Sequence, residues 1–233
     1  MTADRRTRLA ASPLYLVASF LAEDADRVLP RLVAAAAAGV GVVQLRVKHV
    51  PTAWRRALLA RLAAELPPGT LRIVNDDLHA VLADDGTPLA DGVHLGRDDA
   101  ALLAPTGVPQ GERVAGGLRV ARARLGPDLL IGTSANTLEE LAAAVDAGAD
   151  HAGFGAVAPS TTKPDTRPAD MNELRRCLAA FPQVPVFAIG GIGPENLDAV
   201  VRAGCRRAAI GSAILDAQDP GRAAAECLAR LRA

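Results

Sequence analysis

The sequence predicts a single-domain α/β protein of the (β/α)8 type, the TIM barrel, and three observations lead to this prediction. Short apolar runs alternate with helical patterns along most of the chain. The runs are continuously apolar, as expected of parallel strands buried on both faces. Eight such units in 233 residues fit the usual size of this barrel. A doubly wound open sheet is the alternative, because alternation alone does not show that a sheet closes.

The expected strands are the apolar runs at residues 14–19, 40–46, 71–75, 91–96, 129–134, 149–155, 184–191 and 206–212. The helical patterns follow at 26–39, 52–65, 77–83, 98–105, 137–148, 170–181, 194–204 and 219–232. Helices open on Asp, Thr or Pro and close on Gly, which are the common start and stop signals. The fourth helix has the weakest pattern of these.

Two segments lie outside the alternation. Residues 106–128 are expected to form an extended loop with a short helix at 116–125. Residues 1–13 are expected to be an N-terminal extension, ahead of a barrel domain at 14–233. The extension has no apolar core like that of a signal peptide, and no run approaches the length of a membrane span. These features favour a cytoplasmic protein.

Composition excludes several classes of function. The chain is 50% hydrophobic but only 3% aromatic, so a large core of Ala, Val and Leu is expected. The net charge is 0, which argues against a partner that is nucleic acid or a membrane surface. The three cysteines show no CxxC spacing and are interpreted as reduced thiols, not as disulfides or a zinc site.

The basic residues are uneven in type. Of 26, 24 are Arg and two are Lys, namely Lys48 and Lys163. Strand alternation places Gln44, Arg46 and Lys48 on one side of the second strand. Arg46 and Lys48, with Lys163 from across the barrel, could therefore neutralise a diphosphate. The alternative is a set of solvated charges at strand ends.

A metal site is suggested at the ends of the third and fourth strands. Asp76 and Asp99 follow these strands, and paired carboxylates are typical ligands of Mg²⁺. The same residues could instead be helix N-caps. Asp77 and Asp98 compete for either role, because spacing does not distinguish neighbours.

A second phosphate site is suggested at the last two strands. Gly190-Gly191 and Gly211-Ser212 follow them, where many barrels bind phosphate on backbone amides. Tight turns are the alternative explanation for these glycines. No nucleophile–base pair stands out, and His94 is expected to be a wall or core residue.

Taken together, these residues resemble the thiamine phosphate synthase family over residues 15–214. The motifs occur in the family's order, as QLRVK (44–48), NDD (75–77), ADGVHLGRDD (90–99), IGTS (131–134), PSTTK (159–163), AIGGI (188–192) and GSAI (211–214). The resemblance implies a Mg²⁺-dependent alkyl transfer. A pyrimidinylmethyl diphosphate and a thiazole phosphate would react to give thiamine phosphate and diphosphate. Diphosphate would leave first, and the thiazole nitrogen would then attack the resulting pyrimidinylmethyl cation.

The resemblance also implies residue roles. The pyrimidine diphosphate would be bound by Gln44, Arg46, Lys48, Asn75, Ser134 and Lys163, of which Arg46, Lys48, Ser134 and Lys163 would act in catalysis. The thiazole phosphate would be bound by Ser160, Thr161, Thr162, Gly191, Gly211 and Ser212. Mg²⁺ would be bound by Asp76 and Asp99. The partners would be these small molecules.

The sequence departs from the family pattern at several places. Ser19 replaces a Thr, Ala135-Asn136 replaces Thr-His, and Gly211 replaces a Val or Ile. The stretch at 84–88 lengthens the loop before Asp99.

Three alternative functions remain. They are a thiazole tautomerase on the same barrel, a non-catalytic binder of a phosphorylated metabolite, and a barrel isomerase of a sugar or amino-sugar phosphate.

Overall fold

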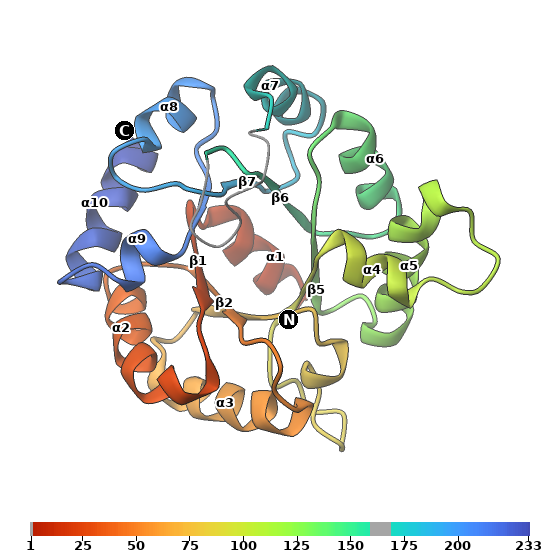
Figure 1. Cartoon of the computed structure of the whole chain (residues 1–233), viewed down its shortest axis with the longest axis horizontal. Helices are drawn as coiled ribbons and strands as arrows, with labels where there is room; N and C mark the ends of the chain where they lie inside the picture. The colour runs from red at the N-terminus through yellow and green to blue at the C-terminus, as the bar shows by residue number, and fades with distance from the viewer. Residues whose placement is uncertain (1, 159–168) are drawn as a thin grey trace.

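The eight strands close into a barrel. The structure is a computed structural model that describes residues 2–158 and 169–233, without the side chains of residues 2–4. Within these residues the strands run parallel and pair in chain order, and β1 (Leu14–Ser19) also pairs with β8 (Ala208–Ile210). This last pairing excludes the open sheet, so the prediction of a single-domain TIM barrel is confirmed. Figure 1 shows the helices arranged around the strands.

The remaining strands lie close to their expected positions. They are β2 (Val42–Arg46), β3 (Leu71–Asn75), β4 (Gly92–Leu95), β5 (Leu130–Ser134), β6 (His151–Gly155) and β7 (Val186–Ile189). Most of their residues are buried, because helices cover the outer face and side chains fill the interior. The parallel register brings all carboxyl ends to one face of the barrel, where the predicted site residues therefore gather.

Helices follow most strands as predicted. The helices are α1 (Thr2–Ala11), α2 (Ala25–Ala37), α3 (Thr52–Glu65), α4 (Arg97–Leu103), α5 (Arg113–Leu125), α6 (Leu138–Asp146), α7 (Met171–Ala180), α8 (Leu197–Arg202), α9 (Ser212–Leu215) and α10 (Pro220–Arg232). Single 3₁₀ turns are η1 (Ala22–Asp24), η2 (Leu78–Ala80) and η3 (Gln110–Glu112).

The helix predicted at 77–83 is wrong. The structure has only the 3₁₀ turn η2 there, followed by an antiparallel bridge between Leu82 and Pro88. Gly86 has a φ of 83° in the connecting turn, a conformation that glycine adopts easily. The apolar spacing of this segment resembled a helix, but its turn residues end the helix after one turn.

The segment 106–128 contains a longer helix than predicted. The short helix expected at 116–125 is part of α5, which begins at Arg113. Packing explains one of the two adjacent glycines within it, Gly117. A Cβ on Gly117 would lie 1.7 Å from the carbonyl oxygen of Ala100, so its absence lets α5 pack directly against α4.

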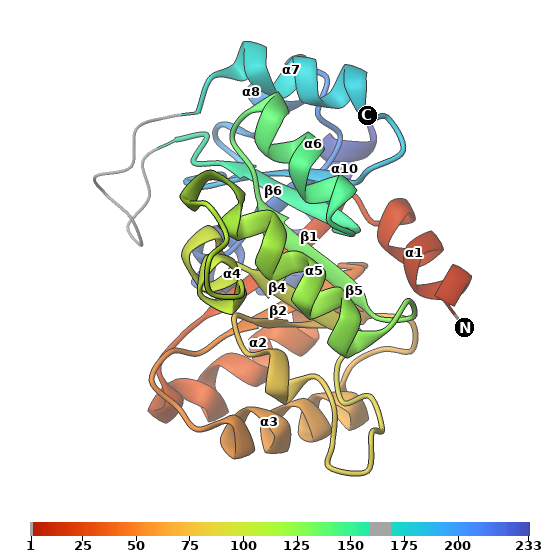
Figure 2. The same cartoon turned by 90° about the vertical axis from the view of Figure 1, so that its right-hand side faces the viewer.

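The interior of the barrel forms its own core. It contains Leu9, Tyr15, Val42, Leu71, Ile73, Leu130, Phe187 and Ala209. Leu9 comes from α1, a helix that the sequence did not predict, and packs at the amino ends of the strands. In Figure 2, α1 lies at the right, at one end of the barrel. This end is closed, so access to the interior is restricted to the opposite face.

Candidate functional site

A cleft of about 390 Å³ opens at the carboxyl ends of β2, β3 and β4. Its lining includes five of the predicted site residues, namely Arg46, Lys48, Asn75, Asp76 and Asp99. They come from segments far apart in the chain and meet because the parallel strands end on one face. Cationic and anionic groups thus share one cleft, as a site for a metal-bound polyanion requires.

The cationic side of the cleft follows β2. Arg46 is the last residue of the strand, and its Nη1 donates a hydrogen bond of 2.9 Å to Ser19 Oγ on β1. Lys48 lies two residues beyond the strand and is exposed. Arg46 is therefore held at the rim by its neighbour, whereas the ammonium of Lys48 is free to adjust to a ligand.

Asp76 adopts an unusual backbone conformation. Its φ is 60°, in the left-handed region that non-glycine residues rarely occupy. Its amide donates to the carbonyl of His94 over 2.9 Å, and its Oδ1 accepts from the amide of Gly96 over 2.8 Å. These bonds tie the end of β3 to the end of β4. The carboxylate of Asp76 is therefore directed toward the first turn of α4.

Asp99 lies in that first turn, close to Asp76. A Cβ on Gly96 would lie 3.2 Å from Asp99 Oδ2 and 3.5 Å from Asp76 Oδ1, so both carboxylates border the same small space. Burial raises the pKa of Asp99, and so does the neighbouring Asp76, whereas Lys48 lowers it. A divalent cation would relieve the repulsion between these carboxylates.

The oxygen donors of this pair fit Mg²⁺. Two carboxylates leave most of an octahedral shell to water or to phosphate oxygens, which is the usual arrangement for this ion. Within the described ranges, no group of three His, Cys, Asp or Glu side chains could hold a metal by itself. The pair thus suits an ion that arrives with its phosphorylated ligand.

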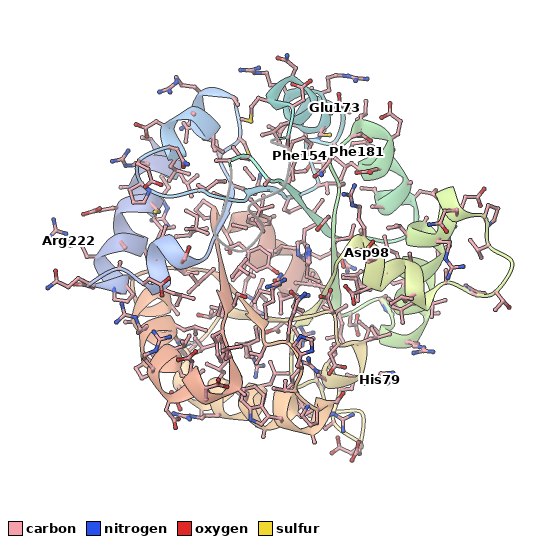
Figure 3. All side chains as sticks on the ribbon, in the orientation of Figure 1. His79, Asp98, Phe154, Glu173, Phe181 and Arg222 are labelled. Carbon is pink, nitrogen blue, oxygen red and sulfur yellow. The ribbon has the colours of Figure 1, made fainter. Side chains whose placement is uncertain are left out.

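The structure distinguishes the competing acidic residues. Asp77 caps η2, and Asp98 is exposed on α4, where Figure 3 labels it. The N-cap of α4 is Gly96. Neither Asp76 nor Asp99 is an N-cap, so the alternative explanation of these two as caps is wrong.

Gln44 and Ser134 do not line the cleft. Gln44 is buried inside the barrel, and its Nε2 donates to the hydroxyl of Tyr15 over 2.9 Å. Ser134 ends β5, with its Oγ 3.4 Å from Nε2 of His94. Both predicted ligands therefore lie on the wall of the barrel interior, apart from the charged residues.

His94 and His151 occupy the barrel interior. Their rings are 5.8 Å apart, and the ring of His151 packs against those of Tyr15 and Phe187. Burial lowers the pKa of His94 to about 4 and that of His151 to about 3, with a smaller contribution to His151 from His94. Both imidazoles are therefore neutral near pH 7, and the prediction of His94 as a core residue is confirmed.

The predicted second phosphate site is only partly described. Gly191 has a φ of 56°, and its carbonyl accepts from Asn196 Nδ2 over 2.6 Å. Gly211 and Ser212 follow the adjacent strand β8. A Cβ on Gly211 would lie 2.9 Å from the carbonyl of Val17, so this backbone approaches β1 closely. The predicted ligands Ser160, Thr161, Thr162 and Lys163 lie outside the described residues.

The sequence did not single out several residues that line the cleft. They include His49, Thr52, Arg55 and His79. Arg55 lies in the first turn of α3 beside Arg56, and no pattern separates the two. Arg56 instead pairs with Asp84 and with the carbonyl of His79 on the surface. Only the helix's rotation relative to β2 and β3 decides which arginine reaches the cleft.

Two further findings concern the molecule as a whole. Among the described residues, no helix has both the length and the apolar character needed to cross a membrane. Cys177, Cys205 and Cys227 are free and buried. The prediction of reduced thiols is consistent with these positions.

The fold and the cleft define a class of protein, a (β/α)8 barrel with a charged site at the carboxyl ends of β2, β3 and β4. The family model described as thiamine monophosphate synthase matches residues 14–214. The chain belongs to this family, as the sequence motifs indicated.

Relatives agree with this assignment. The chain is 42% identical to a thiamine-phosphate synthase of Thiobacillus denitrificans over 87% of each chain. It is 41% identical to one of Gloeobacter violaceus over 98% of this chain, but it spans only 60% of that relative's length. The solved thiamine phosphate pyrophosphorylase of Pyrococcus furiosus has a TM-score of 0.71 and 28% identity, covering 97% of this chain and 98% of its own.

Proposed function

We propose that the protein is a thiamine phosphate synthase, which joins 4-amino-2-methyl-5-pyrimidinylmethyl diphosphate to 4-methyl-5-(2-phosphoethyl)thiazole. The observation that supports this most directly is the shared cleft of Arg46, Lys48, Asp76 and Asp99. The reaction must neutralise a departing diphosphate, and these groups supply the cations and the metal-binding oxygens for it. The relatives' names support the same activity.

Different residues would bind the pyrimidine, its diphosphate, Mg²⁺ and the thiazole phosphate. Gln44, Asn75 and Ser134 would bind and orient the pyrimidine, and Arg46, Lys48 and Lys163 would bind its diphosphate. Asp76 and Asp99 would hold Mg²⁺, which when bound stabilises negative charge on the leaving group. The ligands proposed for the thiazole phosphate are Ser160, Thr161, Thr162, Gly191, Gly211 and Ser212. Arg46, Lys48, Ser134 and Lys163 would be the catalytic residues.

The proposed mechanism needs charge neutralisation and orientation. The bond between the pyrimidine methylene carbon and the diphosphate oxygen breaks, and both electrons leave with the diphosphate. The thiazole nitrogen then donates its electron pair to the methylene carbon. No strong base is needed, which agrees with the low pKa of His94 near Ser134: burial lowers it to about 4, so this imidazole is a weak base. Charges fixed in the cleft before the bond breaks require little reorganisation.

The alternatives have less support. The thiazole tautomerase would use a His near position 136, where this chain has Asn. The side chain of Asn136 binds the backbone, since its Oδ1 accepts a hydrogen bond of 3.2 Å from the amide of Gly155. A non-catalytic binder of a phosphorylated metabolite, or a sugar phosphate isomerase, would not need the complete set of Arg46, Lys48, Asp76 and Asp99.

The proposed partners are these two small molecules and Mg²⁺. We propose no nucleic acid or membrane partner, given the neutral net charge. A cytoplasmic location is part of the same proposal and agrees with the free cysteines.

One assay tests the function. The protein is incubated with both substrates, with and without Mg²⁺, and thiamine phosphate is measured. We expect product only with Mg²⁺, and the double variant Asp76→Ala/Asp99→Ala should lose activity. Asp98→Ala is the matched control, because Asp98 is exposed on the same helix as Asp99. No product under any condition would overturn the proposed synthase, and full activity of the double variant would overturn the metal site.

A further inference from the structure

The side chain of Arg55 connects the two halves of the charged cleft. Its Nη2 donates to the carbonyl of Val47 over 2.9 Å, and its Nη1 donates to the carbonyl of Val50 over 2.9 Å. The same Nη1 lies 2.9 Å from Oδ2 of Asp77. One guanidinium thus joins the loop after β2, which contains Lys48, to the turn after β3, which contains Asp76.

Both segments are strained next to these contacts. In the described part of the chain, His49 and Asp76 are the two non-glycine residues with left-handed φ, at 58° and 60°. Such conformations cost free energy and persist where surrounding contacts enforce them. Val47 and Val50, whose carbonyls Arg55 binds, flank His49. Asp77, the acidic partner of Arg55, directly follows Asp76.

Asp77 is fixed at both carboxylate oxygens. Its Oδ2 accepts from Thr52 Oγ1 over 2.9 Å as well as from Arg55. Its Oδ1 accepts from the amides of His79 and Ala80, at 3.1 and 3.2 Å. These bonds leave Asp77 unsuited to bind a cation, but they make it a rigid anchor. The planar guanidinium can bind this anchor and two carbonyls together, which the single ammonium of a lysine cannot reproduce.

We propose that Arg55 is a positioning residue for the diphosphate site. It holds the backbone of residues 47–50 against Asp77, and thereby fixes Lys48 relative to Asp76 and Asp99. Arg55 acts through the backbone beside Lys48 and Asp76 and does not need to bind the ligand. This inference rests on the proposed function, since it concerns the site for the leaving diphosphate.

The test measures binding of inorganic diphosphate in the presence of Mg²⁺ by isothermal titration calorimetry. The variant Arg55→Lys keeps the charge, so Asp77 is not left without a cation nearby, and circular dichroism checks that the variant is folded. We expect about 10–100-fold weaker binding, as for other residues that orient metal ligands. The double variant Arg55→Gln/Asp77→Asn, which removes both charges, should weaken binding similarly and covers the case in which Arg55→Lys does not fold.

The chain offers a matched structural control in Arg122. It forms an ion pair with Asp150 at the other end of the barrel, at 22% and 8% side-chain exposure, against 17% and 10% for Arg55 and Asp77. Arg122 also donates to backbone carbonyls, including those of Leu129 and Gly148. Arg122→Lys should therefore lower stability as Arg55→Lys does, but leave diphosphate affinity unchanged.

A double-mutant cycle with Lys48→Ala separates positioning from direct ligand contact. If Arg55 acts by placing Lys48, the fold-loss from Arg55→Lys should shrink markedly in the Lys48→Ala background. Fold-losses that simply multiply would overturn the proposal in favour of direct contact. Unchanged affinity of Arg55→Lys, or an equal loss in Arg122→Lys, would also overturn it.

The same measurements separate this inference from the proposed function. A wild-type protein that makes thiamine phosphate, with Arg55→Lys binding diphosphate normally, would overturn the inference alone. A wild-type protein that binds diphosphate and Mg²⁺ but forms no product would overturn the synthase alone. Absence of diphosphate binding by the wild type would overturn the positioning role, because no site would exist to be positioned.

Discussion

At the residue scale, the two lysines stand out in a chain that otherwise uses arginine for positive charge. Lys48 lies in the charged cleft, and Lys163 lies outside the described residues. An ammonium is a compact charge on a flexible stem, whereas a guanidinium is a planar fork. A lysine can therefore follow the diphosphate as its bond to the pyrimidine breaks.

Lys48→Arg should lower the rate of thiamine phosphate formation about tenfold or more, equivalent to about 1.4 kcal/mol of lost transition-state stabilisation. The rate is measured with both substrates at saturation. Arg56→Lys is the matched control, because Arg56 makes a surface ion pair with Asp84. Full activity of Lys48→Arg would mean that only charge matters at this position.

Because two histidines are buried in the neutral form, we expect the free energy of unfolding to depend on pH. Both pKa values are depressed in the folded state, to about 4 for His94 and about 3 for His151, against about 6.5 in the unfolded chain. Between about pH 6.5 and these folded values, the unfolded chain binds more protons. The free energy of unfolding therefore falls as the pH falls through this window.

His151→Phe should make this acid dependence shallower by up to about 1.4 kcal/mol per pH unit. The measurement is urea unfolding at a series of pH values, comparing slopes and not absolute stabilities. His79→Gln is the control, because His79, labelled in Figure 3, is exposed on η2. An unchanged slope in His151→Phe would contradict the burial of a neutral imidazole.

At the element scale, the pair of helices α4 and α5 depends on one glycine. Because Gly117 has no Cβ, α5 can approach the carbonyl oxygen of Ala100, from which a Cβ would lie 1.7 Å away. A Cβ on the neighbouring Gly116 would lie 3.4 Å from the nearest side-chain atoms, which is an ordinary contact distance. α4 also contains Asp99, so the packing of this helix pair fixes one of the proposed metal ligands.

Gly117→Ala should destabilise the protein by about 1–3 kcal/mol, because the added methyl group forces the helices apart. Gly116→Ala is the matched control in the same helix and should be neutral or stabilising by up to about 1 kcal/mol, from helix propensity. Thermal unfolding of both variants checks the prediction. Equal effects of the two substitutions would mean that the close approach to Ala100 is not important.

At the scale of the whole molecule, α1 closes the amino end of the barrel. Arg5 Nε donates to Asp91 over 3.0 Å, and Arg6 Nε donates to Asp150 over 2.7 Å. Each of these aspartates directly precedes a strand and also accepts from the backbone amide of a neighbouring strand. Leu9 of the same helix is 1% exposed and belongs to the interior core.

Leu9→Ala should lower the free energy of unfolding by about 2–5 kcal/mol, through lost burial and a residual cavity. The KM values should stay unchanged, because Leu9 lies at the end of the barrel away from the cleft. Leu102→Ala is the control, since Leu102 is 78% exposed and its loss should change stability by less than about 0.5 kcal/mol. Chemical unfolding and steady-state kinetics measure the two effects.

The alternation of strands and helices, the positions of the strands and the main charged residues of the cleft could be predicted from the sequence, whereas closure of the sheet rests on the pairing of β1 with β8. Hydrophobic periodicity locates buried strands, and the carboxyl ends of parallel strands must meet on one face. Arg46 ends a strand, and Lys48, Asp76 and Asp99 lie within four residues of a strand's carboxyl end, so their meeting was predictable from strand order. The helix at 77–83 was mispredicted because its apolar spacing concealed the turn residues that follow.

Other roles became clear from the folded arrangement alone, because they depend on how a helix is rotated on the strands and on how deeply a side chain is buried. It separates the roles of Asp76 and Asp77, since the carboxylate of Asp76 borders the same small space as that of Asp99, whereas the carboxylate of Asp77 binds Arg55. It distinguishes Arg55 from Arg56, and it places Gln44 and Ser134 inside the barrel. The choice between the two arginines depends on how α3 packs on β2 and β3, and the other outcomes depend on backbone conformation and on contacts between strands. These are long-range arrangements that local sequence patterns do not encode.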